Sequence, residues 1–164
     1  MYRINLALYN TYDKTRWHEA HKRAIARAAP VAEACEGNLI LLDFPLEREE
    51  IEKKLEKTTI NTSFLTSDKF HVLKCKNLPP QFGVMIATTS KPEKKKKISI
   101  RDTIEILKRK SITLVIGLGR KGLPKEIKEE AKYHLDITEK RISLETCTAI
   151  GAIPFVIYHL RRYV

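Results

Sequence analysis

Short runs of Val, Ile and Leu alternate with longer amphipathic segments along this chain, and that alternation restricts its folds more than any other feature. Apolar periodicity predicts strands at 4–8, 39–42, 83–87, 113–116 and 134–137, a short strand or helix near 70–75, and helices at 14–35, 46–57, 100–110, 125–132 and 143–160. Continuous apolar strands are typical of parallel sheets covered on both faces. Since 164 residues suffice for one domain, we expect a single α/β domain, 1–164, with helices on both faces of a mostly parallel sheet of five or six strands.

The positive charge of the chain is concentrated in two segments. Lys and Arg number 31 against 20 Asp and Glu, which gives a net charge of +11. Residues 14–27 hold five basic side chains and one acidic one, and residues 91–110 hold nine and three. Clustered cations favour binding to a polyanion, because each neutralised phosphate releases condensed counterions. We interpret the two segments as a nucleic-acid-binding surface. A solvated loop is the alternative for the lysine run, whose members are Lys94, Lys95, Lys96 and Lys97.

The sequence indicates a protein of the reducing cytoplasm, without a metal site or a membrane segment. The longest apolar stretch, 149–158, contains Pro154 and is shorter than the roughly 20 residues that span a bilayer. The three cysteines, Cys35, Cys75 and Cys147, are widely spaced and odd in number. They support neither a disulfide framework nor a paired-cysteine metal site. We therefore expect a cytoplasmic location, no metal and no membrane association.

The segment 14–35 combines a core stripe with a line of arginines. Trp17 lies on the apolar stripe of this segment, so we expect its indole in the core rather than against a nucleic-acid base. Arg16, Arg23 and Arg27 follow one another along the edge of the stripe, at steps of seven and four residues. Guanidinium groups in such a row are suited to phosphate contacts. Few aromatic side chains are expected at the surface, so readout of single-stranded RNA is not indicated.

The glycine-rich loop that follows the strand at 113–116 permits two interpretations. The first is a dinucleotide-binding turn, Gly117-x-Gly119-x-x-Gly122, with Asp136 following the first glycine by 19 residues. However, only 42 residues follow this loop, and the helix predicted at 125–132 is too polar to pack well on a sheet. Asp136 also leads into a loop and a helix rather than a third strand. NAD binding is therefore the weaker alternative.

The second interpretation combines three loops that follow strand ends, at 87–91, 117–124 and 137–146, because ligands bind at the carboxyl edge of open parallel sheets. Residues 116–124, Ile-Gly-Leu-Gly-Arg-Lys-Gly-Leu-Pro, resemble the G-x-E-x-x-G-L-P loop of SPOUT-class (α/β-knot) RNA methyltransferases. Residues 142–150 resemble the closing S-L-N-V-S-x-A segment of that class. Residues 21–27 and 39–45 fall where its TrmH-like branch carries N-I-G-A-I-A-R and l-i-l-l-x-x-P. In order and spacing, the chain resembles an archaeal branch of this family from Ile4 to about Tyr158.

This resemblance implies a trefoil knot over about 84–160 and a bent S-adenosylmethionine that is held mainly by backbone groups of the three loops. Missing glycine side chains would let backbone amides approach such a ligand closely. The positions implied for the cofactor are Thr88, Thr89, Gly117, Leu118, Gly119, Gly122, Ile137, Ser143 and Leu144. The resemblance also implies RNA, either tRNA or rRNA, as the methyl acceptor, and a homodimer formed through the knot and the C-terminal helix.

In the TrmH-like branch the acceptor is a ribose 2′-hydroxyl, and the arginine that matches Arg27 lies against it. In-line transfer of a methyl group from sulfonium to oxygen requires alignment and the removal of one proton. We assign phosphate anchoring and orientation to Arg27, because a guanidinium stays protonated. The implied catalytic residues are Arg27, Ser143 and Glu145, and the implied RNA-binding residues are Arg16, Arg23, Arg27, Lys94, Lys95, Lys96 and Lys97.

Three positions depart from the family pattern. Gly119 stands where the family's loop has glutamate, Glu145 where it has asparagine, and His21 where it has the asparagine six residues before the arginine. Glu145 could act as a base, alter specificity or mark a site that has lost activity, whereas His21 is expected to be a packed core histidine. The departures leave two functions open: an RNA methyltransferase, with the ribose 2′-oxygen as one acceptor, and a non-catalytic RNA-binding or assembly protein on the same fold.

Overall fold

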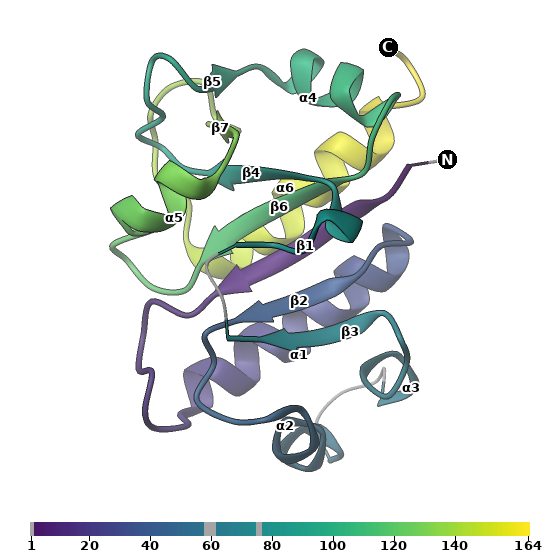
Figure 1. Ribbon diagram of the computed structural model, residues 1–164, viewed down its shortest axis with the longest axis vertical. Helices are drawn as coiled ribbons and strands as arrows, with labels where there is room; N and C mark the ends of the chain where they lie inside the picture. The colour runs from purple at the N-terminus through teal and green to yellow at the C-terminus, as the bar shows by residue number, and fades with distance from the viewer. Residues whose placement is uncertain (1, 58–61, 75–76) are drawn as a thin grey trace.

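The computed structural model describes residues 2–57, 62–74 and 77–164, and its strands form one parallel sheet (Figure 1). The strands are β1 (Ile4–Tyr9), β2 (Leu39–Leu42), β3 (Phe70–Leu73), β4 (Val84–Thr88), β5 (Lys97–Ile98), β6 (Ile112–Gly117) and β7 (Tyr133–Leu135). Their order is β3-β2-β1-β6-β4-β7-β5, and every pairing is parallel. The carboxyl ends of the strands therefore lie along one edge of the sheet.

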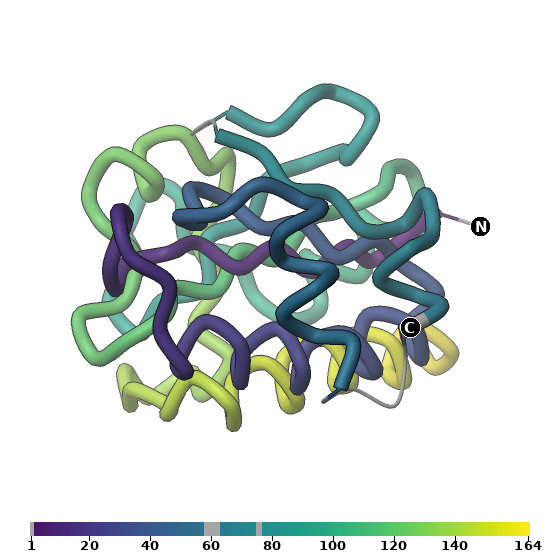
Figure 2. Tube along the Cα trace, turned by 90° about the horizontal axis from the view of Figure 1, so that it is seen from below, coloured from purple at the N-terminus to yellow at the C-terminus, as the bar shows by residue number. Residues whose placement is uncertain are grey.

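Helices lie on both faces of the sheet, but in unequal number. They are α1 (Glu19–Ala34), α2 (Arg48–Leu55), α3 (Thr62–Leu65), α4 (Ile100–Leu107), α5 (Lys125–Glu130) and α6 (Thr146–Leu160), with one 3₁₀ turn, η1 (Pro80–Phe82). All helices except α5 place buried side chains in one large core cluster, together with alternate residues of β1 and β6. In Figure 2, α1 and α6 lie side by side beneath the sheet, and they pack against each other.

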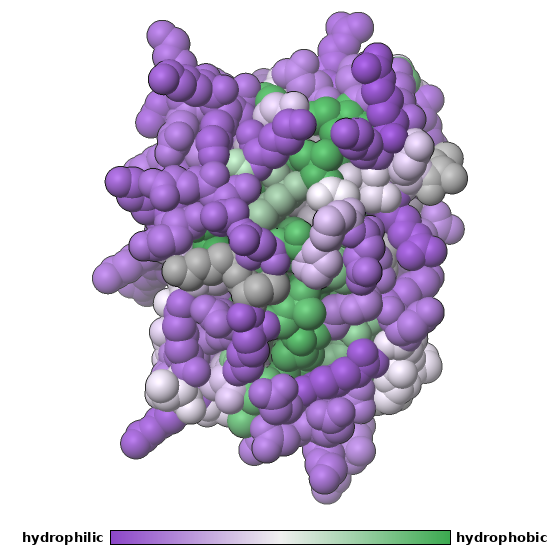
Figure 3. Space-filling model, viewed as in Figure 1, coloured by the Kyte–Doolittle hydropathy of each residue, from purple (hydrophilic) through white to green (hydrophobic). Residues whose placement is uncertain are grey.

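The opposite face of the sheet has a smaller cover. Ile127 of α5 and Phe82 of η1 pack there against Tyr9, Met85 and Val115. A strip of apolar side chains is visible across the middle of this face, between strongly polar regions (Figure 3). The helical layers thus differ, and α1 and α6 form the main support of the central strands.

The sheet has one strand more than the upper limit of our expectation, and it is wholly parallel. The ambiguous segment near 70–75 contains β3, as the sixth strand, and β5 is the seventh among the described residues. β5 has two residues, Lys97 and Ile98, and pairs with β7 at the edge of the sheet. It lies in the lysine run, where no apolar alternation marks a strand, and for this reason the sequence pattern missed it.

Three helices begin later than predicted, and α2 does so by two residues, at Arg48 rather than at residue 46. α1 begins at Glu19 rather than at residue 14, because the Asp13 carboxylate accepts hydrogen bonds from the backbone N of Thr15 (2.9 Å) and Arg16 (3.0 Å) and forms a turn. Arg16 therefore lies outside the helix, and the predicted row of three arginines does not follow one helix. α6 begins at Thr146 instead of residue 143, after Glu145 as its N-cap.

Two aromatic residues of this region lie where the sequence predicted them. Trp17 is half-buried and packs against the large core cluster, and His21 is fully buried. Cys35 and Cys147 are free, while Cys75 lies outside the described residues. Within the described residues no helix is long and apolar enough to cross a membrane, and no three His, Cys, Asp or Glu side chains gather as metal ligands.

Candidate functional site

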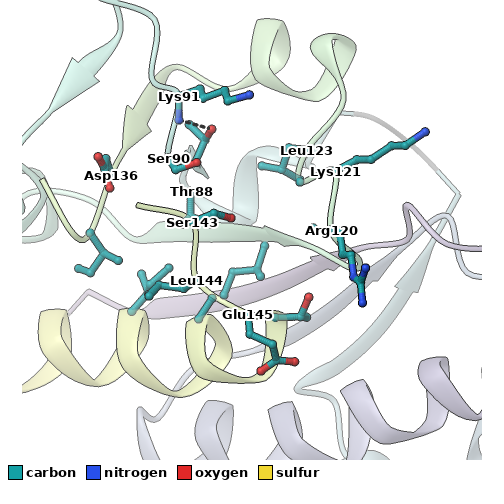
Figure 4. A pocket seen from close by; sticks show the side chains of 18 of the residues that line it. Thr88, Ser90, Lys91, Arg120, Lys121, Leu123, Asp136, Ser143, Leu144 and Glu145 are labelled. Carbon is teal, nitrogen blue, oxygen red and sulfur yellow. Dashed lines mark hydrogen bonds between the residues drawn. The ribbon is translucent and has the colours of Figure 1, made fainter. Parts of the chain in front are cut away.

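Three loops at the carboxyl edge of the sheet enclose a cavity of about 760 Å³. They follow the neighbouring strands β4, β6 and β7, so parallel pairing brings distant parts of the sequence together. Figure 4 shows side chains from all three loops, with α6 passing beneath them. Ala149 and Ile153 of α6 close the cavity from that side. Its volume lies within the range of about 300–1,000 Å³ that is typical of small-molecule sites.

The loop after β6 needs glycine at two positions for its backbone conformation. Gly119 has φ +94° and Gly122 has φ +67°, both in the left-handed region that glycine adopts without strain. A Cβ on Gly119 would meet only Thr11 Oγ1, at 3.5 Å, so conformation rather than space requires glycine there. The glutamate that the resemblance would place at Gly119 would therefore strain this backbone.

Eight of the nine positions implied for the cofactor line the cavity. They are Thr88, Thr89, Gly117, Gly119, Gly122, Ile137, Ser143 and Leu144. Leu118 is the exception, because its side chain is 4% exposed and packs in the large core cluster. Its backbone N donates to the carbonyl of Tyr9 (3.0 Å), which continues the β1–β6 pairing into the loop. Gly117 and Gly119, on either side of Leu118, both line the cavity.

The two threonines of the first loop are held by backbone groups. Thr88 Oγ1 donates to the carbonyl of Val115 (2.8 Å), and Thr89 Oγ1 accepts from the backbone N of Lys91 (3.0 Å). The backbone N of Thr89 donates to the carbonyl of Leu135 (3.0 Å) and so joins the first loop to the end of β7, just before the third loop. These hydroxyls shape the wall of the cavity.

Asp136 is engaged within its own loop. It is 4% exposed. Its Oδ1 accepts from the backbone N (3.1 Å) and Oγ1 (2.8 Å) of Thr138, and its Oδ2 accepts from the backbone N of Arg141 (2.8 Å). A dinucleotide site needs this carboxylate on a ribose hydroxyl. Since both oxygens already order the turn after β7, the geometry offers no support to the NAD interpretation.

Glu145 caps the N-terminus of α6. Its Oε2 accepts from the backbone N of Cys147 (3.1 Å) and Thr148 (3.2 Å). These hydrogen bonds, that of Cys147 first, lower the pKa of the Glu145 carboxyl below its usual range. A carboxylate with a lowered pKa is a weaker proton acceptor. The geometry thus gives Glu145 a structural role and argues against the base that the sequence left open, although its side chain borders the cavity (Figure 4).

The arginines predicted to contact RNA lie outside the cavity of their own chain. Arg27 is exposed on α1, and its Nη1 donates to Sγ of Cys147 at 2.9 Å. Cys147 follows Thr146, which lines the cavity. Arg23 is exposed about one turn earlier on α1, and Arg16 is exposed in the β1–α1 connection. Arg27 therefore borders the first turn of α6 without reaching the three loops.

One lysine of the basic run has a structural role that the sequence did not indicate. Lys96 is half-buried, and its Nζ donates to the carbonyls of Lys128 (3.2 Å), Glu129 (2.7 Å) and Ala131 (2.9 Å) at the end of α5. Carbonyl groups at a helix C-terminus attract cations. The assignment of Lys96 to RNA is corrected accordingly. The other three members, Lys94, Lys95 and Lys97, are exposed.

Four basic side chains at the cavity were missed in the sequence. The cavity lining includes Lys91, Arg120, Lys121 and Lys128. Figure 4 labels the first three at the rim of the cavity. The sequence did contain a signal for two of them, because Arg120 and Lys121 lie between Gly119 and Gly122. Side chains within a ligand-binding loop lie close to its ligand. Lys128 is also fixed to the first loop, since its Nζ donates to the carbonyl of Lys91 (2.8 Å). This rim is suited to an anionic group.

The chain belongs to the family DUF531, described as a protein of unknown function, whose family model matches residues 4–158. A relative from the archaeon Methanocaldococcus jannaschii, MJ0224, described as uncharacterised, is 54% identical over 172 residues. That match covers 99% of this chain and 97% of the relative.

Solved structures with the same fold include methyltransferases. A Bacillus anthracis protein provisionally described as an RNA methyltransferase has a TM-score of 0.67 at 17% identity, over 98% of this chain and 95% of its own. A structure described as concerning 2-OH methylation of C/U34 on tRNA has a TM-score of 0.60 at 16% identity, over 99% and 97%. The SpoU methyltransferase AviRb of Streptomyces viridochromogenes, solved with AdoMet, has a TM-score of 0.58 at 17% identity, over 96% and 57%. At these identities the likeness establishes the fold alone, which this chain shares with these proteins.

Proposed function

We propose that the protein is an S-adenosylmethionine-dependent methyltransferase that acts on RNA, either tRNA or rRNA. The observation that carries this proposal is the single cavity into which three loops, remote in sequence, converge at the carboxyl edge of the sheet. The fold likeness to AviRb, whose structure contains AdoMet, and to a structure concerned with tRNA methylation supports the same class. A trefoil knot over about 84–160 is part of the proposal.

The cavity lining fits the two chemically different ends of S-adenosylmethionine. Leu144, Ala149 and Ile153 provide an apolar floor for the adenine ring. Arg120 and Lys121 provide cations for the methionine carboxylate, next to a loop whose glycines leave its backbone accessible. Bound there, the cofactor supplies a methyl group on a positively charged sulfur. This chain binds and orients that group.

The ribose 2′-oxygen is the acceptor that we propose, with Arg27 as the orienting residue. Its guanidinium is exposed and presents donors that fit a phosphate of the acceptor nucleotide. With Glu145 held as a helix cap and its pKa lowered, we assign no side-chain base to the reaction, and the proton of the 2′-hydroxyl passes to solvent water as the methyl–oxygen bond forms and the methyl–sulfur bond breaks. Alignment of the hydroxyl with the methyl group is therefore the main contribution of the chain to catalysis.

Because Arg27 lies outside the cavity of its own chain, we propose a homodimer in which it serves the cavity of the partner subunit. The outward side of α6 supports this. Phe155 and Val156 are only half-buried, and a Cβ on Gly151 would meet no atom of the described residues within 4 Å. Small and apolar residues on one exposed helix side allow a second helix to approach closely.

The proposal is tested by calorimetric titration with S-adenosylmethionine, followed by transfer of a labelled methyl group to RNA. The acceptor is bulk RNA from cells that lack the protein. We expect saturable 1:1 binding per chain and incorporation that mass spectrometry locates on one nucleotide. Gly117→Val is expected to abolish cofactor binding, because an added Cβ would lie only 3.0 Å from the Gly122 backbone. Gly151→Ala is the matched control, because residue 151 does not line the cavity. Folded wild-type protein that produces no heat with the cofactor would contradict the proposal.

A non-catalytic RNA-binding protein on the same fold is the second candidate. It is favoured by the two departures at the cavity, since Gly119 removes a loop carboxylate and Glu145 is occupied as a cap. RNA binding without any heat from S-adenosylmethionine would establish this alternative.

A further inference from the structure

The β1–α1 connection carries an exposed tyrosine, Tyr12, and approaches the glycine loop through the preceding residue, Thr11. Thr11 Oγ1 lies 3.5 Å from the position that a Cβ on Gly119 would take. In Figure 1 the connection and the loop after β6 both lie at the carboxyl edge of the sheet. Tyr12, the next residue, is 56% exposed. Neither Thr11 nor Tyr12 lines the cavity, so this tyrosine belongs to the surface that adjoins the glycine loop through Thr11.

The backbone on both sides of Tyr12 is fixed by Asn10 and Asp13. Asn10 is fully buried. Its Nδ2 donates to the carbonyls of Asp13 (2.6 Å) and Asp43 (3.0 Å), and its Oδ1 accepts from the backbone N of Tyr12 (3.0 Å). The Asp13 carboxylate fixes the next turn, as described above. A ligand that contacts Tyr12 therefore does not have to order this loop first.

The Tyr12 ring is supported from within by two histidines. It packs edge-to-face against His18, with ring centroids 5.1 Å apart, and against His21 at 5.7 Å. Both histidines are themselves fixed, because Nε2 of His18 lies 2.8 Å from Asp13 Oδ2, and Nε2 of His21 lies 3.1 Å from Asn10 Oδ1. The Tyr12 ring thus packs against two histidines whose own positions are set by these polar contacts.

The charges around this ring are those of an RNA-binding surface. Arg16 and Arg23 are exposed in and just after the same connection, and Arg120 stands on the adjacent glycine loop. Aromatic rings flanked by cations bind single-stranded RNA, since bases stack on the ring and the cations contact the backbone. We propose that Tyr12 is a stacking platform for an unpaired base of the RNA substrate, next to the nucleotide presented at the cavity. This rests on the proposed action on RNA, and it departs from the expectation that readout of single-stranded RNA is not indicated.

The test compares the affinities of the full chain for two fluorescein-labelled probes by anisotropy: a 12-nucleotide oligoadenylate and an abasic oligomer of the same length. Tyr12→Ala and Tyr12→Leu are each expected to weaken binding of oligoadenylate by about 5- to 150-fold, the range found for loss of one base–aromatic stack. Tyr12→Phe keeps the ring and is expected to stay within about twofold of wild type. Neither loss variant should change the affinity for the abasic probe, which has no base to stack.

Tyr163→Ala is the matched control, because Tyr163 is 82% exposed beyond α6, at the other end of the molecule. It is expected to bind both probes as wild type does. Equal affinities of Tyr12→Ala and wild type for oligoadenylate would overturn the inference alone, and so would equal weakening on both probes. Wild-type protein that binds S-adenosylmethionine but neither probe nor bulk tRNA would overturn the RNA part of the proposed function together with it.

Discussion

Arg27 of α1 and Cys147 of α6 are joined across the helix pair, with Nη1 of the arginine 2.9 Å from Sγ of the cysteine. Cys147 is the second residue of α6, directly after Thr146, which lines the cavity. The guanidinium is thereby tied to the segment that closes the cavity from below. An arginine that is already ordered loses less conformational entropy when it binds a phosphate. Its position relative to the cavity is thus set by the packing of α1 on α6.

Replacement of Arg27 should affect methyl transfer far more than folding. Arg27→Ala removes an exposed side chain, so we expect little change in the melting temperature. If the guanidinium orients the acceptor nucleotide, its loss should lower kcat/KM for RNA by about 100-fold, the cost of a misplaced reactant. The binding of S-adenosylmethionine should stay unchanged, because Arg27 does not line the cavity. Arg23→Ala, exposed one turn away, is the control for charge alone, and equal losses in both variants would refute the specific role.

Glu145 should stabilise the protein as the N-cap of α6. Glu145→Ala leaves the backbone N of Cys147 and Thr148 without their side-chain acceptor, and we expect the melting temperature to fall by a few degrees. Glu145→Asn keeps a good N-cap and should fold as wild type does. If alignment alone carries catalysis, Glu145→Asn also keeps most of the methyl transfer. A fully inactive but stable Glu145→Asn would instead identify Glu145 as the base.

The folded protein should lose stability as the pH falls below about 6.5. Burial lowers the pKa of His21, His71 and His134 below the ordinary histidine value, whereas the same side chains in the unfolded chain titrate near 6.5. Between those values the unfolded chain binds protons that the folded chain does not, so acid favours unfolding. The stability that these three histidines contribute is complete above their pKa in the unfolded chain, and it is lost as the pH falls through their lower pKa in the folded protein.

Urea denaturation between pH 7.5 and pH 5 measures this loss. His134 is the best single site, because its Nδ1 accepts from the backbone N of Glu93 (3.0 Å) and would have to give up that hydrogen bond when protonated. His134→Gln should reduce the slope of the free energy of unfolding against pH. Stability that rises toward pH 5 in wild type would contradict the argument.

The sequence predicted the central strands and the three convergent loops because these depend on simple periodicity. The apolar runs at 39–42 and 113–116 are buried on both faces and have few alternative structures. β5 could not be found in this way, since two residues of a lysine run form a strand only through pairing with β7. The start of α1 was wrong because a local turn at Asp13 competes with the helix.

Side-chain roles were harder to predict than loop positions. Lys96 and Lys95 are neighbours of the same type, and only the position of α5 decides that one ammonium is held by carbonyls while the other is exposed. Glu145 was considered as a base because it stands where the resembling family has asparagine, and its side chain does line the cavity. That the same carboxylate caps α6 depends on the exact residue at which the helix begins. Such contacts are set by tertiary geometry and leave no pattern in a single sequence.

Substitution by methionine should therefore lower the stability of the protein at Lys96 but not at the neighbouring Lys95. Lys96→Met removes a charged donor from three carbonyls at the end of α5, and we expect the free energy of unfolding to fall by about 1–3 kcal/mol. Lys95→Met should leave stability unchanged and, if this lysine contacts a phosphate, lower the slope of log affinity for RNA against log salt by about 1. Urea denaturation and salt titration of RNA binding measure the two effects. Equal destabilisation by both substitutions would show that the carbonyl contacts of Lys96 contribute nothing.

Gly151 offers a direct test of the proposed homodimer. Among the described residues of one chain no neighbour requires glycine there, because an added Cβ meets none of their atoms within 4 Å, and glycine inside a helix costs about 1 kcal/mol relative to alanine. In a monomer, Gly151→Leu should therefore be neutral or stabilising. If a second copy packs on this side of α6, the same substitution blocks the approach of its helix and converts a dimer to a monomer. Light scattering at micromolar concentration, with Gly151→Ala as the smaller matched change, distinguishes the two cases. A monomeric wild type, or a Gly151→Leu variant that remains fully dimeric, would remove this interface, and Arg27 would then have no partner cavity to serve.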